Sequence, residues 1–307
     1  MALSSDRPYP PLDLIDRVLT ISPWTSEPVR AYEELGAQTK RTVVSLLPGD
    51  WSFESKRVLD FGSGAGRTLR HFLPEAEQGE FWGADIDGPS IEWLREHLAP
   101  LNGWHCGAWP PLGLEHGTFD LIYTVSVFTH LTDNYTPMAL ELHRLLKPDG
   151  LLIVSYMGRW NSDRFAKEPW NEDRIGRNVL YADQPWDLGG PVVLTSDWWF
   201  REHWGRAFDV VAVTEESHDM TWVLLRKRAV DITTEEFDRP GDDPREVAAA
   251  HHNVTQVRME MREQAARSAQ ALAAQREGYE KRLTAMEHSL SWRLTAPLRG
   301  RGRRRRS

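Results

Sequence analysis

The sequence predicts an α/β fold with a doubly wound, mostly parallel sheet, followed by a long C-terminal helix. Between residues 56 and 155, short apolar runs that favour strands alternate with segments of helical periodicity. The first run ends in the glycine-rich turn Asp60-Phe61-Gly62-Ser63-Gly64-Ala65-Gly66. Residues 245–290 lack proline and space apolar side chains three or four positions apart, with gaps. Alternating strands and helices form parallel sheets with right-handed crossovers.

The predicted elements follow one another along the chain. Strands are expected at 58–60, 79–85, 102–106, 118–124 and 151–155, with helices beginning at 67, 87 and 133. The run Thr195-Ser196-Asp197 predicts a capped helix, and strands at 208–214 and 221–225 follow it as a hairpin. Residues 156–194 break the alternation and are expected to be a long, irregular, aromatic insert.

The remaining residues flank a core domain assigned to 50–230. Residues 1–49 are an N-terminal cap segment, in which a helix at 29–47 either covers the ligand site or packs as an ordinary helix. Residues 231–244 contain two prolines and a glycine and are expected to be a linker. Residues 245–290 are expected to be a helical, coiled-coil stalk or a single exposed helix, and 291–307 a basic tail.

The composition suits a soluble protein in a reducing compartment. Cys106 is the only cysteine of the 307 residues, so no intrachain disulfide forms, and a buried position suits it better than a nucleophilic role. No apolar run is long enough to span a membrane. The net charge is −8, yet the last seventeen residues hold seven arginines and no acid. We therefore expect a cytoplasmic protein whose tail alone meets an anionic surface.

The glycine turn carries the first chemical information. Glycines adopt positive φ and let a ligand approach the main chain. Dinucleotide sites favour G-x-G-x-x-G, but Arg67 occupies the last position of that pattern and the third glycine comes one residue early. Asp85 ends the next predicted strand about 20 residues further on, where an acid marks a ribose site. The turn therefore predicts a nucleoside ligand other than a dinucleotide.

Four motifs resemble, in order, those of the class I S-adenosylmethionine-dependent methyltransferases. They are Asp60 to Gly66, Gly83-Ala84-Asp85-Ile86-Asp87, Phe119-Asp120-Leu121-Ile122 and Leu145-Leu146-Lys147-Pro148-Asp149-Gly150. In the last motif, aspartate replaces the first glycine of the family's LKPGG turn. Ser126-Val127-Phe128-Thr129-His130-Leu131 further resembles a sub-group marked by FTHL. The resemblance implies a seven-stranded, Rossmann-like sheet and S-adenosylmethionine as the cofactor.

The resemblance also implies a role for each cofactor-binding residue. Asp60 faces the methionine ammonium, and Gly62, Gly64 and Gly66 let the main chain approach methionine and ribose. Asp85 accepts hydrogen bonds from the ribose hydroxyls, and Ile86 flanks the adenine.

The third strand and the fourth-strand motif leave alternatives open. Many family members carry an acid after the third strand, but here residues 105–109 contain none. Ala108 and Trp109 are therefore expected to contact the adenine, with a core position as the alternative for Trp109. His130 is a candidate general base, or else a helix-capping or buried, hydrogen-bonded histidine. No cluster of histidine and acids has the spacing of metal ligands.

The methyl acceptor is predicted from the insert and the tail. Six tryptophans between 156 and 204 either stack on sugar rings or fill the core. Residues 289–299 resemble the ending that follows coiled coils in bacterial surface-polysaccharide glycosyltransferases and methyltransferases. Trp292 beside arginines suits the inner face of a membrane, whereas the acidic body disfavours nucleic acid.

These features predict a methyltransferase that O-methylates a sugar of a surface glycan or of its lipid-linked precursor. It would form a homo-oligomer through 245–290. A methyltransferase of soluble small molecules such as secondary metabolites is one alternative. A non-catalytic scaffold with a methyltransferase-like fold is the other.

Overall fold

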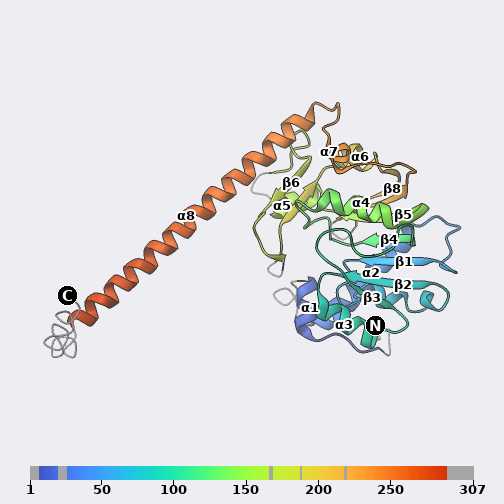
Figure 1. Ribbon diagram of the computed structural model, residues 1–307, viewed down its shortest axis with the longest axis horizontal. Coiled ribbons are helices and arrows are strands. Elements are labelled where there is room, and N and C mark those ends of the chain that lie inside the picture. Colours follow the sequence, from blue (N-terminus) through green and yellow to red (C-terminus); the bar gives the residue numbers. More distant parts are fainter. Residues whose placement is uncertain (1–6, 20–25, 166–168, 187–188, 218–219, 289–307) are drawn as a thin grey trace, which may run out of the picture. The chain divides into compact units, whose positions relative to one another are not determined.

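The computed structural model describes residues 7–19, 26–165, 169–186, 189–217 and 220–288. Its large sheet contains β1 Arg57–Phe61, β2 Glu80–Asp85, β3 Asn102–His105, β4 Phe119–Thr124, β5 Leu146–Tyr156, β8 Phe208–Ser217 and β9 Met220–Lys227. The strand order is β3-β2-β1-β4-β5-β9-β8 (Figure 1). β1 to β5 are parallel, and β9 pairs antiparallel with both β5 and β8. The predicted doubly wound, seven-stranded sheet is therefore confirmed.

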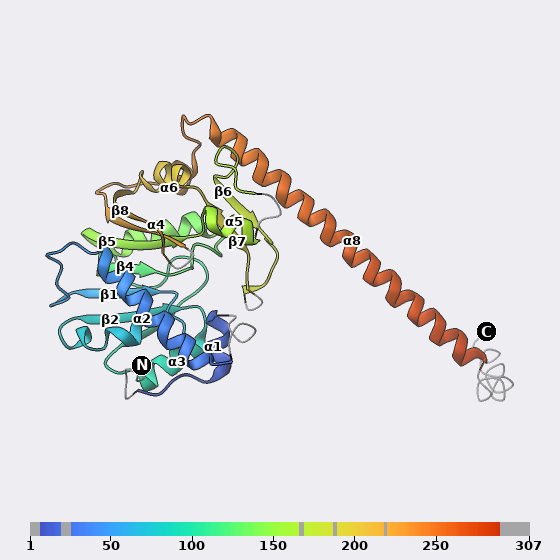
Figure 2. The ribbon, with the colours of Figure 1, turned by 180° about the vertical axis from the view of Figure 1, so that it is seen from behind.

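Helices cover both faces of this sheet (Figures 1 and 2). One layer contains α1 (Leu12–Leu19), α2 (Pro28–Leu46) and α3 (Gly88–His97), and the other contains α4 (Tyr135–Leu145), α6 (Asp197–Trp204) and α7 (Thr234–Asp238). On β4, Leu121 and Tyr123 pack against the first layer and Ile122 against the second. Because successive side chains of a strand point to opposite faces, strands buried on both sides appear in the sequence as continuous apolar runs.

The segment after the glycine turn differs from the helix expected to begin at residue 67. It forms two short 3₁₀ helices, η1 (Leu69–Phe72) and η2 (Glu75–Glu77). Pro74 lacks the N–H that an α-helix needs at this position and restricts the residue before it, so the helix cannot continue beyond its first turn.

The insert is more regular than the expected irregular loop. It contains α5 (Arg159–Phe165), β6 (Arg177–Leu180) and β7 (Val192–Thr195), and β6 and β7 pair as a second, antiparallel sheet. Ile175, Leu180, Val192 and Leu194 form a small apolar cluster of their own. Each strand has only four residues, and residues 181–191 separate the two, so local periodicity does not reveal the pairing.

The stretch 231–244, expected to be a linker, packs on the domain. Its helix α7 begins with a capping box between Thr233 and Glu236 and buries Phe237 completely. Trp204 of α6 lies edge-on to the Phe237 ring, with centroids 5.9 Å apart. The first compact unit extends through Val254 and therefore includes this stretch.

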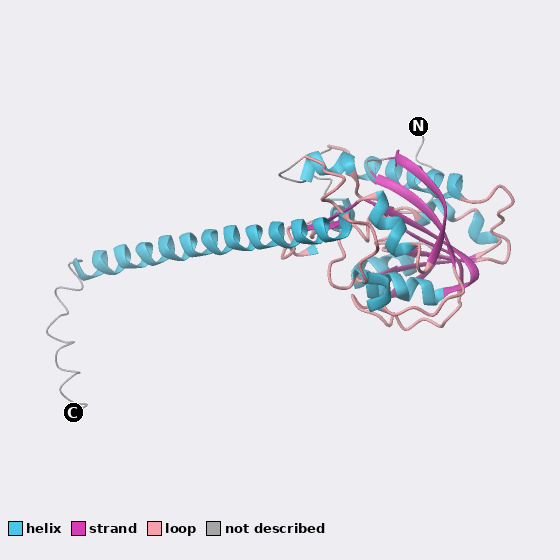
Figure 3. Cartoon of the chain, turned by 90° about the horizontal axis from the view of Figure 1, so that it is seen from above, coloured by secondary structure: helices cyan, strands magenta, loops and turns pink. Residues whose placement is uncertain are grey.

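The second unit begins at Thr255 and consists mainly of the continuation of α8 (Arg245–His288), a single uninterrupted helix (Figure 3). Leu272, Tyr279 and Leu283 on this helix are exposed. Among the helices of the described residues, none combines the length and apolarity needed to cross a membrane. The predicted tail, 291–307 with Trp292, lies outside the described residues.

Candidate active site

The glycine turn lies where the strand order reverses, between β1 and β4, at the carboxyl ends of the strands. Open α/β sheets bind their ligands in the crevice at this point. Gly62, Gly64 and Gly66 all have positive φ, at 85°, 53° and 81°. A Cβ at Gly62 would overlap the Val127 side chain, and one at Gly66 would lie 2.8 Å from Leu98 Cδ1. Glycine is therefore required at both positions by conformation and by space.

Asp85, at the end of β2, is held by two main-chain donors. Its Oδ2 accepts from the Gly64 N–H at 2.7 Å, and its Oδ1 accepts from the Asp87 N–H at 2.9 Å. Burial raises the pKa of Asp85, and these two hydrogen bonds oppose the rise. An ionised carboxylate has about four acceptor sites, so lone pairs remain for the hydroxyls of a ribose.

Asp60, at the end of β1, is 2% exposed. Its pKa is raised from 3.8 to about 7: burial is the largest cause, Tyr123 and Arg67 oppose the rise, and the neighbouring Asp85 adds to it. A buried carboxyl group with this pKa would be stabilised in its charged form by a cation bound beside it. The methionine ammonium of S-adenosylmethionine fits this requirement.

The N-terminal helix α2 packs against the chain that follows the glycine turn. A Cβ at Gly36 of α2 would overlap the Arg67 carbonyl, so α2 lies in close contact with the chain just beyond the glycine turn. Tyr32 of α2 is fully buried and interacts electrostatically with Asp60, and its hydroxyl has no hydrogen-bond partner among the described residues. A buried, unpaired hydroxyl beside a buried acid indicates a polar ligand at this position. Of the two alternatives for this helix, the geometry favours a cover over the site.

On the other side of the turn, Arg17 of α1 pairs with the Asp87 carboxylate at 2.7 Å. The Ser90 hydroxyl donates to the second oxygen of that carboxylate at 2.6 Å. Since the Asp87 N–H holds Asp85, this pair links the N-terminal cap to the predicted ribose site.

The residues predicted to contact the adenine follow β2 and β3. The Cys106 N–H donates to the Asp85 carbonyl at 3.0 Å, which joins the ends of the two strands. Ile86 is 41% exposed. Trp109 is 56% exposed, which excludes the alternative that this tryptophan is a core residue. The Asn134 amide donates to the Ala108 carbonyl at 2.8 Å. Burial raises the pKa of Cys106 to about 12, so its thiol stays neutral.

His130 follows β4 and binds the insert. Its Nδ1 lies 2.7 Å from the Pro191 carbonyl oxygen. Because a carbonyl only accepts, Nδ1 carries the proton and Nε2 keeps its lone pair, with no hydrogen bond to any described residue. Burial lowers the pKa of His130, which favours the neutral ring. His130 is thus half-buried and hydrogen-bonded, and the same tautomer leaves Nε2 able to accept a proton.

Several residues of the site were not identified from the sequence. Asp60 interacts electrostatically with Tyr32, Arg67 and Tyr123. Asp87 forms an ion pair with Arg17, which is far from it in the chain. Ser126 has a φ of 57° and donates its N–H to the Ser155 hydroxyl at 2.8 Å, which ties the ends of β4 and β5 together. Of these contacts, the sequence indicated only the packing of the helix at 29–47, through its apolar pattern.

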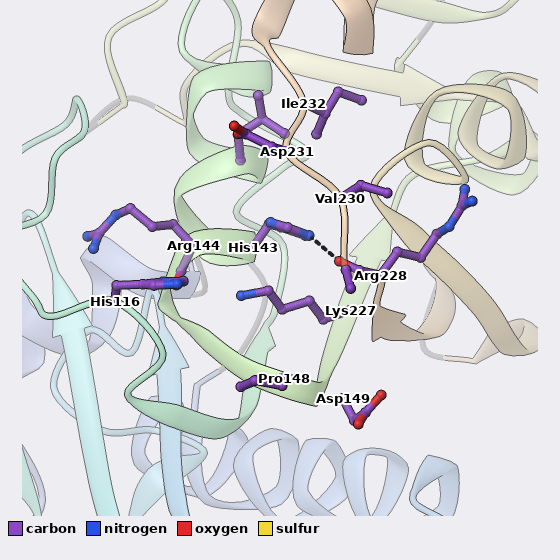
Figure 4. A pocket seen from close by; sticks show the side chains of 12 residues that line it. His116, His143, Arg144, Pro148, Asp149, Lys227, Arg228, Val230, Asp231 and Ile232 are labelled. Atoms are coloured by element: carbon purple, nitrogen blue, oxygen red, sulfur yellow. Dashed lines mark hydrogen bonds between the residues drawn. The ribbon is translucent and has the colours of Figure 1, made fainter.

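Two of the hollows on the described part of the domain lie at opposite edges of the sheet. The first, of about 950 Å³, lies at the carboxyl end of β5 and is lined by Tyr156, Gly158, Arg159, Trp170, Glu172, Thr195, Asp197, Arg201, Val213 and Thr221. The second, of about 600 Å³, lies at the opposite edge of the sheet (Figure 4). There the Lys227 ammonium donates to the Leu146 carbonyl at 2.6 Å, and His143 Nε2 donates to the Arg228 carbonyl at 3.0 Å. These main-chain contacts give both side chains a structural role.

Comparison with known proteins finds similarity to methyltransferases over part of the chain. Residues 59–152 match the family model described as a methyltransferase domain. Over 115 residues the chain is 30% identical to the malonyl-[acyl-carrier protein] O-methyltransferase of Magnetococcus marinus, covering 34% of this chain and 39% of that protein. Over 122 residues it is 27% identical to the uncharacterized protein RP028 of Rickettsia prowazekii, covering 38% and 49%. The chain thus spans less than half the length of these curated relatives.

Solved structures with a similar fold include two S-adenosylmethionine-dependent methyltransferases. The one from Aquifex aeolicus is 17% identical with a TM-score of 0.46, covering 70% of this chain and 98% of that chain. The one from Mesorhizobium loti is 15% identical with a TM-score of 0.46, covering 62% and 99%. The residues that match the methyltransferase-domain model, 59–152, include the glycine turn and the strands β2 to β4.

Proposed function

We propose that the protein transfers the methyl group of S-adenosylmethionine to a hydroxyl group of a sugar. The observation that carries the transfer itself is the pair of acids at the ends of β1 and β2. Asp60 is buried and its pKa is raised to about 7, and Asp85 is aligned by the Gly64 N–H. Together they match an ammonium and a ribose at the two ends of one glycine turn.

S-adenosylmethionine, when bound, supplies a methyl group activated by its sulfonium. In this proposal Asp60 binds the ammonium, Asp85 binds the ribose hydroxyls, and Ile86, Ala108 and Trp109 enclose the adenine. Tyr32 donates its hydroxyl to the ligand from α2. The chain then contributes mainly alignment, because an in-line displacement at a sulfonium disperses charge and depends on the approach of the acceptor.

His130 is proposed as the base that takes the proton of the acceptor hydroxyl. The Pro191 carbonyl keeps the Nδ1 proton in place, so the proton enters at Nε2. A histidine whose pKa is lowered by burial is neutral at pH 7 and therefore ready to accept.

Two features support a sugar as the acceptor, and a third supports transfer to oxygen. The insert carries exposed Trp160 and Trp186, whose flat faces suit sugar rings. The sequence of 289–299 resembles the ending of polysaccharide-biosynthesis proteins. The name of the Magnetococcus relative assigns it methyl transfer to oxygen. We propose a sugar of a surface glycan or of its lipid-linked precursor, methylated in the cytoplasm at the inner face of a membrane.

We propose that the stalk at 245–290 assembles the chains into an oligomer and that the tail at 291–307 binds the protein to a membrane. The apolar residues of α8 that follow Val254 recur at 257, 261, 265 and 272 and are separated by three, four or seven positions, as in helices that pair. Ending the chain after Val254 should convert an oligomer to a monomer in sedimentation. Deleting 291–307 should abolish binding to vesicles that contain phosphatidylglycerol, while binding that persists would remove the tail from the membrane proposal.

Transfer of labelled methyl groups tests the function. The full chain is incubated with labelled S-adenosylmethionine and a glycolipid extract, with the Asp85→Ala variant as the control. Label in the sugar of a glycolipid supports the whole proposal. Label only in water-soluble small molecules would replace the sugar acceptor with the small-molecule alternative. No transfer together with no binding of S-adenosylhomocysteine would refute the methyltransferase proposal itself.

A further inference from the structure

The hollow at the carboxyl end of β5, called the β5 cleft below, lies on the same edge of the sheet as the glycine turn. Tyr156 lines the cleft and directly follows Ser155, which accepts the Ser126 N–H. The Val193 N–H of β7 donates to the Thr129 carbonyl at 2.8 Å, and β7 ends in the cleft at Thr195. The segment that follows β4 therefore contacts two regions. Its Val127 lies against the glycine turn, and its Thr129 is hydrogen-bonded to β7, which lines the β5 cleft.

The charged side chains that line the β5 cleft form two pairs. Arg201 lies 2.7 Å from Asp197 on α6, and Arg159 lies 3.8 Å from Glu172. No other ionised side chain lines the described part of the cleft, so the two pairs balance. The Asp197 side chain is 51% exposed and that of Glu172 is 42% exposed, which leaves both accessible to a ligand. A balanced lining gives no net attraction for a phosphate or a carboxylate.

The cleft combines these pairs with a fixed aromatic ring. The Trp170 indole N–H donates to Glu172 Oε2 at 2.7 Å, so the ring and the carboxylate are held side by side. The Trp198 indole N–H donates to the Glu172 carbonyl at 2.9 Å and ties this turn to α6. A guanidinium only donates and a carboxylate only accepts, so a neighbouring pair matches hydroxyl groups, which do both. A flat indole suits the apolar C–H face of a sugar ring.

We infer that the β5 cleft binds a neutral sugar unit of the methyl acceptor, with Trp170 against the ring and the pairs Arg159–Glu172 and Arg201–Asp197 on its hydroxyls. This inference rests on the proposed function. It adds where the acceptor sugar binds and that this sugar is uncharged. Acidic and phosphorylated sugars are disfavoured because they would face Glu172 and Asp197 without an unpaired cation to offset them.

Direct binding to the full chain tests the inference. The probes are the neutral methyl glycosides of mannose, galactose and rhamnose, compared with glucuronic acid and glucose 6-phosphate. We expect saturable binding of at least one neutral glycoside by saturation-transfer NMR, and binding of the two acidic probes about tenfold weaker or absent. Trp170→Ala and Glu172→Gln should each weaken the neutral probe about tenfold. Asp149→Asn changes an acid at the opposite edge of the sheet that does not line the cleft, and it should have no effect.

Binding of S-adenosylhomocysteine is measured on every variant. It reports whether the protein is folded and whether the cofactor proposal holds, and it should be unchanged. Intact cofactor binding with no saturable binding of any neutral glycoside would overturn the cleft proposal alone. Acidic probes that bind as tightly as neutral ones, or a Trp170→Ala variant that binds normally, would also overturn it.

Discussion

Replacing Asp60 with asparagine should weaken cofactor binding and, at the same time, stabilise the ligand-free protein. The carboxyl is buried at the end of β1, and burial raises its pKa to about 7. In the ligand-free protein the negative charge is costly, whereas the cofactor ammonium needs it. Asparagine keeps the shape of the side chain and removes the charge, so the two effects have opposite signs.

The magnitudes follow from the pKa. With a value near 7, the ionised fraction falls about eightfold between pH 7.5 and pH 6, and the affinity for S-adenosylhomocysteine should fall with it. Loss of a hydrogen bond to a charged group costs about 1.5–3 kcal/mol, so Asp60→Asn should bind the ligand about 10- to 150-fold more weakly at pH 7.5. Its affinity should also lose most of the pH dependence.

The stability effect has a definite sign. The folded-state pKa of Asp60 lies above its ordinary value of 3.8, so the native state binds more protons than the unfolded state between these values. The contribution of Asp60 to stability is therefore lost as pH rises from about 4 to 7. A shift of about three pKa units corresponds to about 4 kcal/mol, which is the upper limit of the stabilisation expected for Asp60→Asn at pH 7.5.

Titration calorimetry with S-adenosylhomocysteine at pH 6 and 7.5, together with urea unfolding of the ligand-free protein, measures both effects. A wild-type affinity that does not change between these pH values would refute the assignment of Asp60 to the ammonium. An Asp60→Asn variant that is less stable than the wild type would refute the conclusion that the buried charge of Asp60 destabilises the ligand-free protein.

Three further predictions concern other parts of the domain. Asp85→Ala should weaken S-adenosylhomocysteine binding at least tenfold in calorimetry, whereas Asp149→Ala, an acid at the opposite edge of the sheet, should leave it unchanged. His130→Ala should lower kcat about 100-fold and abolish the fall of kcat at acidic pH under saturating cofactor, and full activity would exclude it as the base. Phe237→Ala should lower the free energy of unfolding by about 3–5 kcal/mol, and a change below about 1 kcal/mol would show that α7 is detached from the core in solution.

The architecture of the sheet was accessible from local sequence because its causes are local. Strands buried on both faces produce apolar runs such as Leu121-Ile122-Tyr123, and glycines with positive φ appear as glycines in the sequence. The acids Asp60 and Asp85 end their strands, so a parallel sheet brings them to the same edge whatever the loops do. The Ser196 cap of α6 was also predicted, because its hydroxyl accepts the Trp199 N–H within one turn.

The features that the sequence did not predict depend on contacts between separate segments of the chain. The pairing of β6 with β7 and the burial of Phe237 join segments that carry no mark of each other in the sequence. The helix expected to begin at residue 67 is instead a pair of short 3₁₀ helices, because Pro74 lacks the N–H that a continuing α-helix needs.

The sequence by itself determined the α/β fold class and the mostly parallel, seven-stranded sheet, and it predicted the two acids Asp60 and Asp85 as cofactor-binding residues. Only the tertiary structure decided that Tyr32 and α2 pack beside Asp60, that Pro191 sets the tautomer of His130, and that two ion pairs and Trp170 meet at the end of β5. The physical reason is that burial, charge pairing and tautomer depend on groups brought together from distant parts of the chain. A single position in the sequence does not contain that information.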